Sequence, residues 1–317
     1  MRLLAIFFAL FSGCAAAQPF PSKPIRVLVG FTAGGAPDII ARMLGAKLQE
    51  GLGQPIVIEN RPGAAGNVAG DAVAKSAADG YTLLMGNVSL TISVHAASKP
   101  PFDVTQDLEP VGMVASLPLM LVVNSGLPVN SLRELIDYAK ARPGTLNYGS
   151  VGHGSAHHLS GEMLQSMTGM KMVHVPYKGG GAAMQAILAQ EAHLLFLTPL
   201  ALMPNVRAGK MKALGVTSAK RTGTAPDVPT IAEAGLTGFE VDNWHTLFAP
   251  RGTPREVFAR LNSELNKVLG AADVKQQLLA SQGAEAWIST PAQARSHVLA
   301  EIEKWGRLIR QTGVRLE

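Results

Sequence analysis

The chain has 317 residues, 47% of them hydrophobic and 16% charged, so it can bury a large core and does not have the composition of a disordered protein. Its 28 basic and 23 acidic residues leave a net charge of +5, spread along the chain without a basic block. This distribution argues against nucleic-acid binding and fits a small anionic ligand, and the length predicts about two domains.

The first 17 residues have the pattern of a secretory signal peptide. Arg2 precedes an apolar run at 3–11, and three alanines at 15–17 form a small-residue cleavage signal. The apolar run is too short to span a bilayer, and no later stretch is long enough, so we expect a periplasmic protein without a membrane span. A lipid anchor on Cys14, the only cysteine, is the less favoured alternative, because Phe11 stands where lipoprotein signals prefer leucine.

The first mature residues alternate between strand and helix patterns. A continuous apolar strand is predicted at 25–29, a helix between Pro37 and Gly53, and a second strand at 56–58. A helix of small residues at 66–78 and a strand at 81–85 follow. This order of elements predicts an open α/β sheet.

A second α/β unit of similar size follows. It comprises strands at 117–123, 146–150, 171–176, 193–197 and 213–217, alternating with helices at 131–141, about 156–167, 182–189 and 202–208. The tail has a strand at 244–249 and then only helical patterns from Pro254 onward. We therefore expect two lobes, each a central β-sheet flanked by helices, with a ligand cleft between them. The predicted divisions are a signal peptide at 1–17, lobe 1 at 18–122 plus 248–317, and lobe 2 at 123–247.

Motifs of enzyme and metal sites are absent from the sequence. There is no phosphate loop, no G-x-S-x-G elbow and no H-E-x-x-H. His157 and His158 are neighbours, and adjacent helical positions diverge by about 100°, which suits one metal ion poorly. The sequence therefore predicts neither a catalytic site nor a metal or cofactor.

Five loops that follow predicted strands are rich in glycine and hydroxyl residues, and most of them precede a helix. They lie at Thr32–Pro37, Asn87–Ser89, Ser150–His157, Tyr177–Gly181 and Thr198. Ligands of open α/β sheets bind at the carboxyl ends of strands, where glycines admit a close approach and helix N-termini attract anions. The loops therefore predict a small anion held between the lobes by backbone N–H groups and hydroxyls.

Two side chains in these loops allow more than one interpretation. Asp38 fits support of the helix start better than ligand contact, since its charge would repel an anion placed against it. His157 is suited to donating a hydrogen bond from the first turn of its helix, whereas His158 should point elsewhere.

Several sequence blocks resemble the Bug family of periplasmic binding proteins, the tripartite tricarboxylate transporter receptors. The blocks are, in order, PSKPIRVLVGFTAGGAPDIIAR, GQPIVIENRPGAAGNVAGDAVAKSAADGYTLLMG, LNYGSVGHGSAHHLSGE, MVHVPYKGGGAAMQAIL, GKMKALGVTSAKR, PDVPTIAEAGLTGFE and LFAPRGTPREVFARLN. The resemblance covers residues 19–317. It implies a two-lobed fold similar to the type II periplasmic binding proteins, and a receptor that delivers small organic ligands, commonly carboxylates, to a transporter or a sensor.

The loops and the resemblance together give one set of candidate ligand-binding residues: Phe31, Thr32, Gly34, Gly35, Asp38, Asn87, Ser89, Ser150, Gly154, Ser155, His157, Tyr177, Lys178, Gly179 and Thr198. Many relatives carry Asp followed by Asn where this chain has Thr198 and Pro199. Thr198 lacks a charge to meet an amino group, so we expect a non-amino carboxylate, or a nearly neutral aromatic acid or amide, rather than an amino acid.

Two alternatives to simple transport remain open at this point. The chain could be an exported hydrolase or isomerase that uses Ser155 and His157. It could also be a ligand-gated partner of a sensor protein, which is compatible with solute binding.

Overall fold

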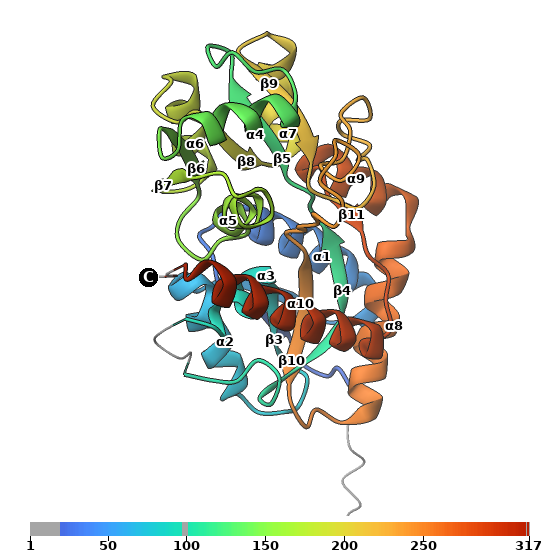
Figure 1. The fold of residues 1–317 in the computed structure, drawn as a ribbon. Coiled ribbons are helices and arrows are strands. Elements are labelled where there is room, and N and C mark those ends of the chain that lie inside the picture. Colours follow the sequence, from blue (N-terminus) through green and yellow to red (C-terminus); the bar gives the residue numbers. More distant parts are fainter. Residues whose placement is uncertain (1–19, 97–100, 315, 317) are drawn as a thin grey trace, which may run out of the picture.

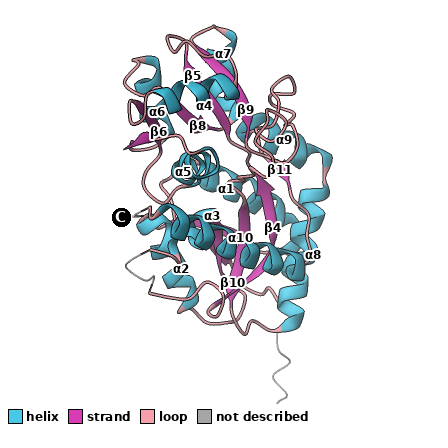
Figure 2. Ribbon diagram, viewed as in Figure 1, coloured by secondary structure: helices cyan, strands magenta, loops and turns pink. Residues whose placement is uncertain are grey.

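The computed structural model describes residues 20–96, 101–314 and 316, and its strands form two separate sheets (Figure 1). The predicted signal peptide and Cys14 lie outside the described residues. Each unit has strands at its centre and helices around them (Figure 2). The predicted α/β class is therefore confirmed.

The first sheet has six strands in the order β11-β4-β10-β3-β1-β2. Strands β1, β2 and β3 are parallel, whereas β10 is antiparallel to β3 and β4, and β11 is antiparallel to β4. The strands are β1 (Ile25–Val29), β2 (Ile56–Asn60), β3 (Thr82–Asn87), β4 (Leu108–Ser116), β10 (His245–Pro250) and β11 (Glu285–Ala286).

Helices cover both faces of this sheet. One face packs against α1 (Ala36–Leu52), α8 (Arg255–Gly270) and α9 (Ala272–Gln282). The other face packs against α2 (Asn67–Ala74), which follows the short η1 (Ala64–Gly66), and against α3 (Val88–Ser93) and α10 (Pro291–Thr312). Burial on both faces explains the apolar runs at 27–29 in β1 and 83–85 in β3, whereas β2, at the edge of the sheet, is only partly buried.

The second sheet has five strands in the order β7-β6-β8-β5-β9. They are β5 (Met120–Asn124), β6 (Leu146–Ser150), β7 (Met172–Pro176), β8 (Leu194–Leu197) and β9 (Met211–Val216). Helices α4 (Leu132–Ala141) and α5 (Ala156–Thr168) cover one face, and α6 (Gly180–Leu188) and α7 (Pro199–Arg207) cover the other.

The chain passes between the two sheets twice, at 117–119 and at 217–244. The two crossings bond to each other: the Leu117 N–H donates to Asp242 Oδ1 at 2.9 Å, and the Leu119 N–H donates to Thr217 Oγ1 at 2.9 Å. The predicted divisions at 122/123 and 247/248 fall inside β5 and β10, because β5 belongs to the second sheet and β10 to the first.

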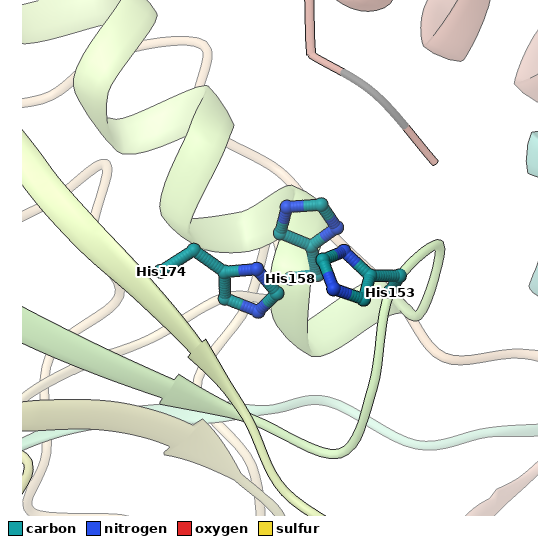
Figure 3. Close-up of side chains that lie close together, drawn as sticks. All are labelled: His153, His158 and His174. Atoms are coloured by element: carbon teal, nitrogen blue, oxygen red, sulfur yellow. The ribbon is translucent and has the colours of Figure 1, made fainter. Parts of the chain in front are cut away.

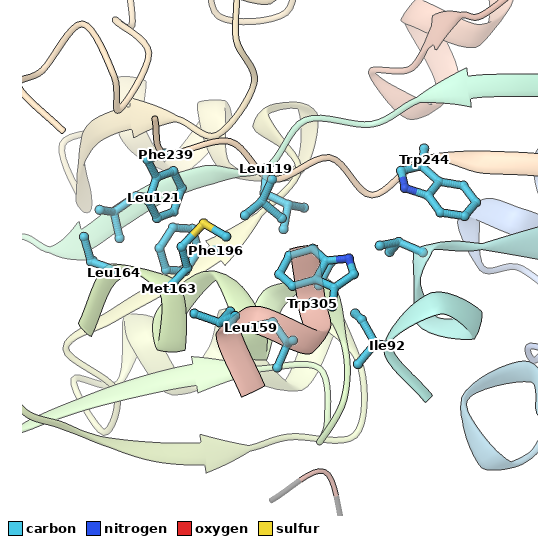
Figure 4. Close-up of a cluster of buried hydrophobic side chains, with 14 of the residues drawn as sticks. Ile92, Leu119, Leu121, Leu159, Met163, Leu164, Phe196, Phe239, Trp244 and Trp305 are labelled. Carbon is cyan, nitrogen blue, oxygen red and sulfur yellow. The ribbon is translucent and has the colours of Figure 1, made fainter. Parts of the chain in front are cut away.

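One apolar cluster joins the two units (Figure 4). It includes Trp244 and Trp305 beside the first sheet and Leu159 and Phe196 in the second unit, all fully buried. Both indole N–H groups donate to Glu301, at 3.1 and 3.0 Å. A buried carboxylate that accepts from two indoles fixes the orientation of both rings.

Most predicted elements are present, with shifted ends, but β4, α3 and the short η1 and β11 were missed. Strand β4 was not predicted, because Pro110 and Gly112 interrupt its pattern; Pro110 lacks an N–H and is tolerated next to a register shift in the pairing with β10. The predicted strand at 117–123 begins only at Met120, and helix α3 was also missed. The small-residue helix ends at Ala74 instead of 78.

Candidate functional site

Five helices begin around one cavity of about 490 Å³. Their N-cap residues, all of which line the cavity, are Gly35 of α1, Asn87 of α3, Ser155 of α5, Gly179 of α6 and Thr198 of α7. The first two belong to the first unit and the other three to the second. The cavity is therefore shared by both units, at the carboxyl ends of their strands.

Within the part of the chain that the structure describes, no Asp, Glu, Lys or Arg lines this cavity. Three of the five N-caps, Gly35, Gly179 and Thr198, make no side-chain capping hydrogen bond to their own helix. First-turn N–H groups have no intrahelical acceptor, and together with the helix dipole they favour a negative group. The cavity thus offers backbone donors to an anion without a fixed countercharge.

The loop that leads into α1 is held from behind by Asp38. Its carboxylate accepts from the Gly34 N–H and from Asn60 Nδ2, both at 2.9 Å, and pairs with Arg42 at 2.9 Å. Burial acts to raise the pKa of Asp38, but these donors outweigh it and hold the pKa below its ordinary value. Asp38 is 3% exposed and does not line the cavity, so it acts on the shape of the loop.

The loop that leads into α5 is fixed by its own side chains. Ser150 Oγ accepts from the Gly152 N–H at 3.1 Å and contacts His174 Nε2 at 2.6 Å. Ser155 Oγ donates to the Gly152 carbonyl at 2.7 Å and accepts from the His158 N–H at 3.3 Å. These bonds hold the first turn of α5 toward the cavity.

His157 faces the cavity, as the sequence suggested, whereas His158 does not line it. Burial lowers the pKa of His157 to about 4, so the ring is neutral near pH 7. Its Nδ1 has no hydrogen-bond partner in the described part of the protein. A neutral imidazole with a spare nitrogen can orient a ligand by one hydrogen bond.

The cavity brings together nine of the candidate residues: Phe31, Thr32, Gly35, Asn87, Ser89, Ser155, His157, Gly179 and Thr198. The remaining candidates that do not line it are Gly34, Asp38, Ser150, Gly154, Tyr177 and Lys178. Among these, Gly154 lines a neighbouring cavity, Tyr177 packs against an apolar cluster, and Lys178 is exposed.

Ten further residues line the cavity. Six of them lie inside loops that the sequence singled out: Ala36, Pro37, Val151, His153, Ala156 and Gly180. Four lie outside those loops and were not predicted: Ala65, Leu117, Leu197 and Asn243. The sequence carried a signal for Ala65, because Gly63 and Gly66 on either side of it indicate a turn. In the structure Ala65 has a φ of +54°. Asn243 had no such signal: it reaches the cavity from the returning crossing, where its N–H donates to the Leu117 carbonyl at 3.2 Å.

The described helices include none with both the length and the apolar character needed to cross a bilayer.

Comparisons with known proteins agree with this geometry. The family model described as "Tripartite tricarboxylate transporter family receptor" matches residues 40–314. Protein BugT of Bordetella pertussis is 39% identical over 323 residues, covering 100% of this chain and 99% of BugT.

Two solved structures of Rhodopseudomonas palustris proteins are also similar. Rpa4515 with adipate is 38% identical with a TM-score of 0.83, over 93% of this chain and 99% of that one. MatC with bound malate is 33% identical with a TM-score of 0.78, over 92% of this chain and 100% of MatC. The chain therefore belongs to the tripartite tricarboxylate transporter receptors, the Bug family of periplasmic binding proteins, as its motifs predicted.

Proposed function

We propose that the cavity at the five helix N-termini binds a small organic carboxylate, which the protein captures in the periplasm and delivers to a membrane transporter. The observation that carries this proposal is the convergence of five N-caps from both units on one cavity without charged side chains. Rpa4515 and MatC, which share this fold and about a third of the sequence, hold adipate and malate. Both ligands are carboxylates without an amino group.

The ligand-binding residues in this proposal are the nine candidates that line the cavity, together with the other ten residues of its lining. A carboxylate would accept hydrogen bonds from the first turns of α1 and α6, and from His157 at the start of α5, because the Ser155 hydroxyl already donates to the Gly152 carbonyl. Because Thr198 is uncharged, an ammonium group would lose its hydration here without gaining a countercharge. This supports selection against amino acids.

The two units act as lobes in this proposal, divided at the crossings 117–119 and 217–244. Residues 18–116 and 245–317 then form lobe 1, and the intervening residues form lobe 2. Closure of the lobes about the two bonded crossings would complete the site and present a surface that a transporter subunit recognises. Recognition by a sensor protein instead would use the same closed state.

Solute binding is favoured over catalysis because the groups for nucleophilic attack are not arranged together. Ser155 Oγ donates to the Gly152 carbonyl, and no hydrogen bond joins it to His157 within the described residues. An activated serine needs a base within hydrogen-bond reach. The family's members are receptors, which agrees with this arrangement.

Isothermal titration calorimetry with the mature chain tests the proposal. The panel contains adipate, malate, monocarboxylates, an aromatic acid and amino acids of matched length. We expect saturable one-to-one binding of at least one non-amino acid and weaker binding of its amino analogue. A folded protein that binds none of the panel would contradict the carboxylate proposal, and turnover of a bound compound without any partner would favour the enzyme alternative.

A further inference from the structure

Three histidines form a cluster at the edge of the cavity, and one of them, His153, also lines it (Figure 3). His153 lies in the loop before α5, His158 in the first turns of α5, and His174 on β7. One ring nitrogen from each lies within 4.8 Å of the others. In the sequence only His157 and His158 are adjacent, and no local pattern places His174 next to them.

Ring orientations define which nitrogens are engaged. The rings of His158 and His174 stack with centroids 3.9 Å apart, and the ring of His153 stands edge-on to both, at 5.5 and 5.0 Å. His174 Nε2 contacts Ser150 Oγ at 2.6 Å, and His158 Nε2 lies 3.9 Å from Glu162 Oε1. Both Nε2 atoms therefore face oxygen partners of the kind that orient metal-binding histidines from behind.

The lone pair on Nδ1 of His158 is engaged in this arrangement. It accepts the Gly154 N–H at 3.2 Å, so Nε2 holds the ring proton and faces Glu162. Metal coordination through Nδ1 therefore replaces the hydrogen bond from Gly154, which requires the loop at 152–154 to shift.

We propose that His153, His158 and His174 bind one divalent transition-metal ion of the zinc, nickel or copper class. Three imidazoles without a carboxylate in the cluster favour these ions over magnesium or calcium, which prefer oxygen ligands. The fourth position would be open to water, because His153 is exposed.

Binding requires a small rearrangement that the loop allows. Nitrogens around a tetrahedral zinc ion at ~2.0–2.1 Å are about 3.3 Å apart, so gaps of up to 4.8 Å would shorten by at most about 1.5 Å. His153 lies between Gly152 and Gly154, whose φ angles of +128° and +67° suit glycine best, and it can approach from the exposed side. One of the two stacked rings would turn about its Cβ–Cγ bond so that its lone pair meets the others.

The ion would also fix the loop that forms one wall of the ligand cavity. His153 lines this cavity and the neighbouring cavity of about 360 Å³. Coordination of His153 would therefore hold residues 151–155 in one conformation.

Equilibrium dialysis of the untagged, metal-free mature chain against Zn²⁺, followed by elemental analysis, tests the proposal. We expect one zinc ion per chain. His153→Ala should weaken binding by more than about 10-fold, the least that loss of even an outer-shell partner commonly costs. Because His153 is exposed in a loop, this variant should fold, which circular dichroism verifies.

A matched control is His193→Gln, which removes a histidine outside the cluster and should leave zinc binding unchanged. Co²⁺ in place of Zn²⁺ should give the visible absorption of a low-coordinate nitrogen site, and His153→Ala should remove it. No zinc uptake at micromolar concentrations, or equal uptake by the wild type and His153→Ala, would overturn the proposal. The assay contains no organic acid, so its outcome is independent of the proposed solute.

Discussion

Thr198→Asp tests whether the negative charge of the ligand lies in this cavity. Thr198 is the N-cap of α7 and lines the cavity without capping its own helix. Asp is among the best N-cap residues, so the substitution should leave the fold intact or stabilise it slightly. Its carboxylate would share the cavity with the carboxylate of the ligand, and the two should repel.

The size of the cavity sets the range of the repulsion between the two carboxylates. A volume of about 490 Å³ corresponds to a sphere of about 10 Å diameter. With an effective dielectric constant of about 20, two unit charges repel by about 1.7 kcal/mol at 10 Å and about 2.8 kcal/mol at 6 Å. The dissociation constant of an organic acid should therefore rise by about 15- to 100-fold.

Thr198→Asn is the matched control, because Asn caps helices equally well and has nearly the same shape without the charge. Calorimetry of both variants with the same acid separates charge from shape. We expect the Asn variant to bind close to wild type, and the Asp variant to bind weakly and to gain affinity for ligands that carry an amino group. Equal affinities of the Asp and Asn variants would refute the placement of the anion in this cavity.

Four further substitutions test the stability of the fold. Gly34→Ala should lower the free energy of unfolding by about 1 kcal/mol in thermal denaturation, because Gly34 has φ +83°, whereas Gly35→Ala, at φ −75°, should not. Equal stabilities would contradict the strain argument. Burial raises the pKa of Asp242 to about 6, so the free energy of unfolding should fall by up to about 3 kcal/mol as pH rises from about 4 to 6. Denaturant titrations of Asp242→Asn should lack this slope, and an unchanged slope would assign it to other groups. Gly161→Ala should destabilise the second unit by about 1–3 kcal/mol, since its Cβ would meet the Tyr148 ring; full stability would mean that the ring moves freely.

The elements that the sequence predicts well are those whose burial is uniform. Strand β1 lies at the predicted residues because all of it except Arg26 is apolar and buried. Strand β4 was missed because Pro110 and Gly112 make its pattern resemble a loop, and its pairing partners β10 and β11 lie far along the chain. Element type follows from local pattern, whereas such pairings depend on tertiary contacts.

The site likewise contains some residues that local sequence signals predict and others that depend on tertiary contacts. Glycine- and hydroxyl-rich loops predicted that the five residues now seen as N-caps lie at the site, although helix α3 itself was missed and α7 begins earlier than predicted. Asn243 and the histidine cluster carry no such signal. Asn243 arrives from the returning crossing, and His174 joins His153 and His158 only because β7 pairs with β6. Lys178, one of the candidate ligand-binding residues, is exposed and does not line the cavity.

The position of a bound carboxylate is the most direct test of the account. A crystal structure of the mature protein, grown with the organic acid that binds most tightly, would locate it. We predict that the carboxylate oxygens lie within hydrogen-bond distance of first-turn N–H groups from α1 and from at least one of α5 and α6. A ligand bound elsewhere, or held only by side chains of one unit, would contradict the central claim.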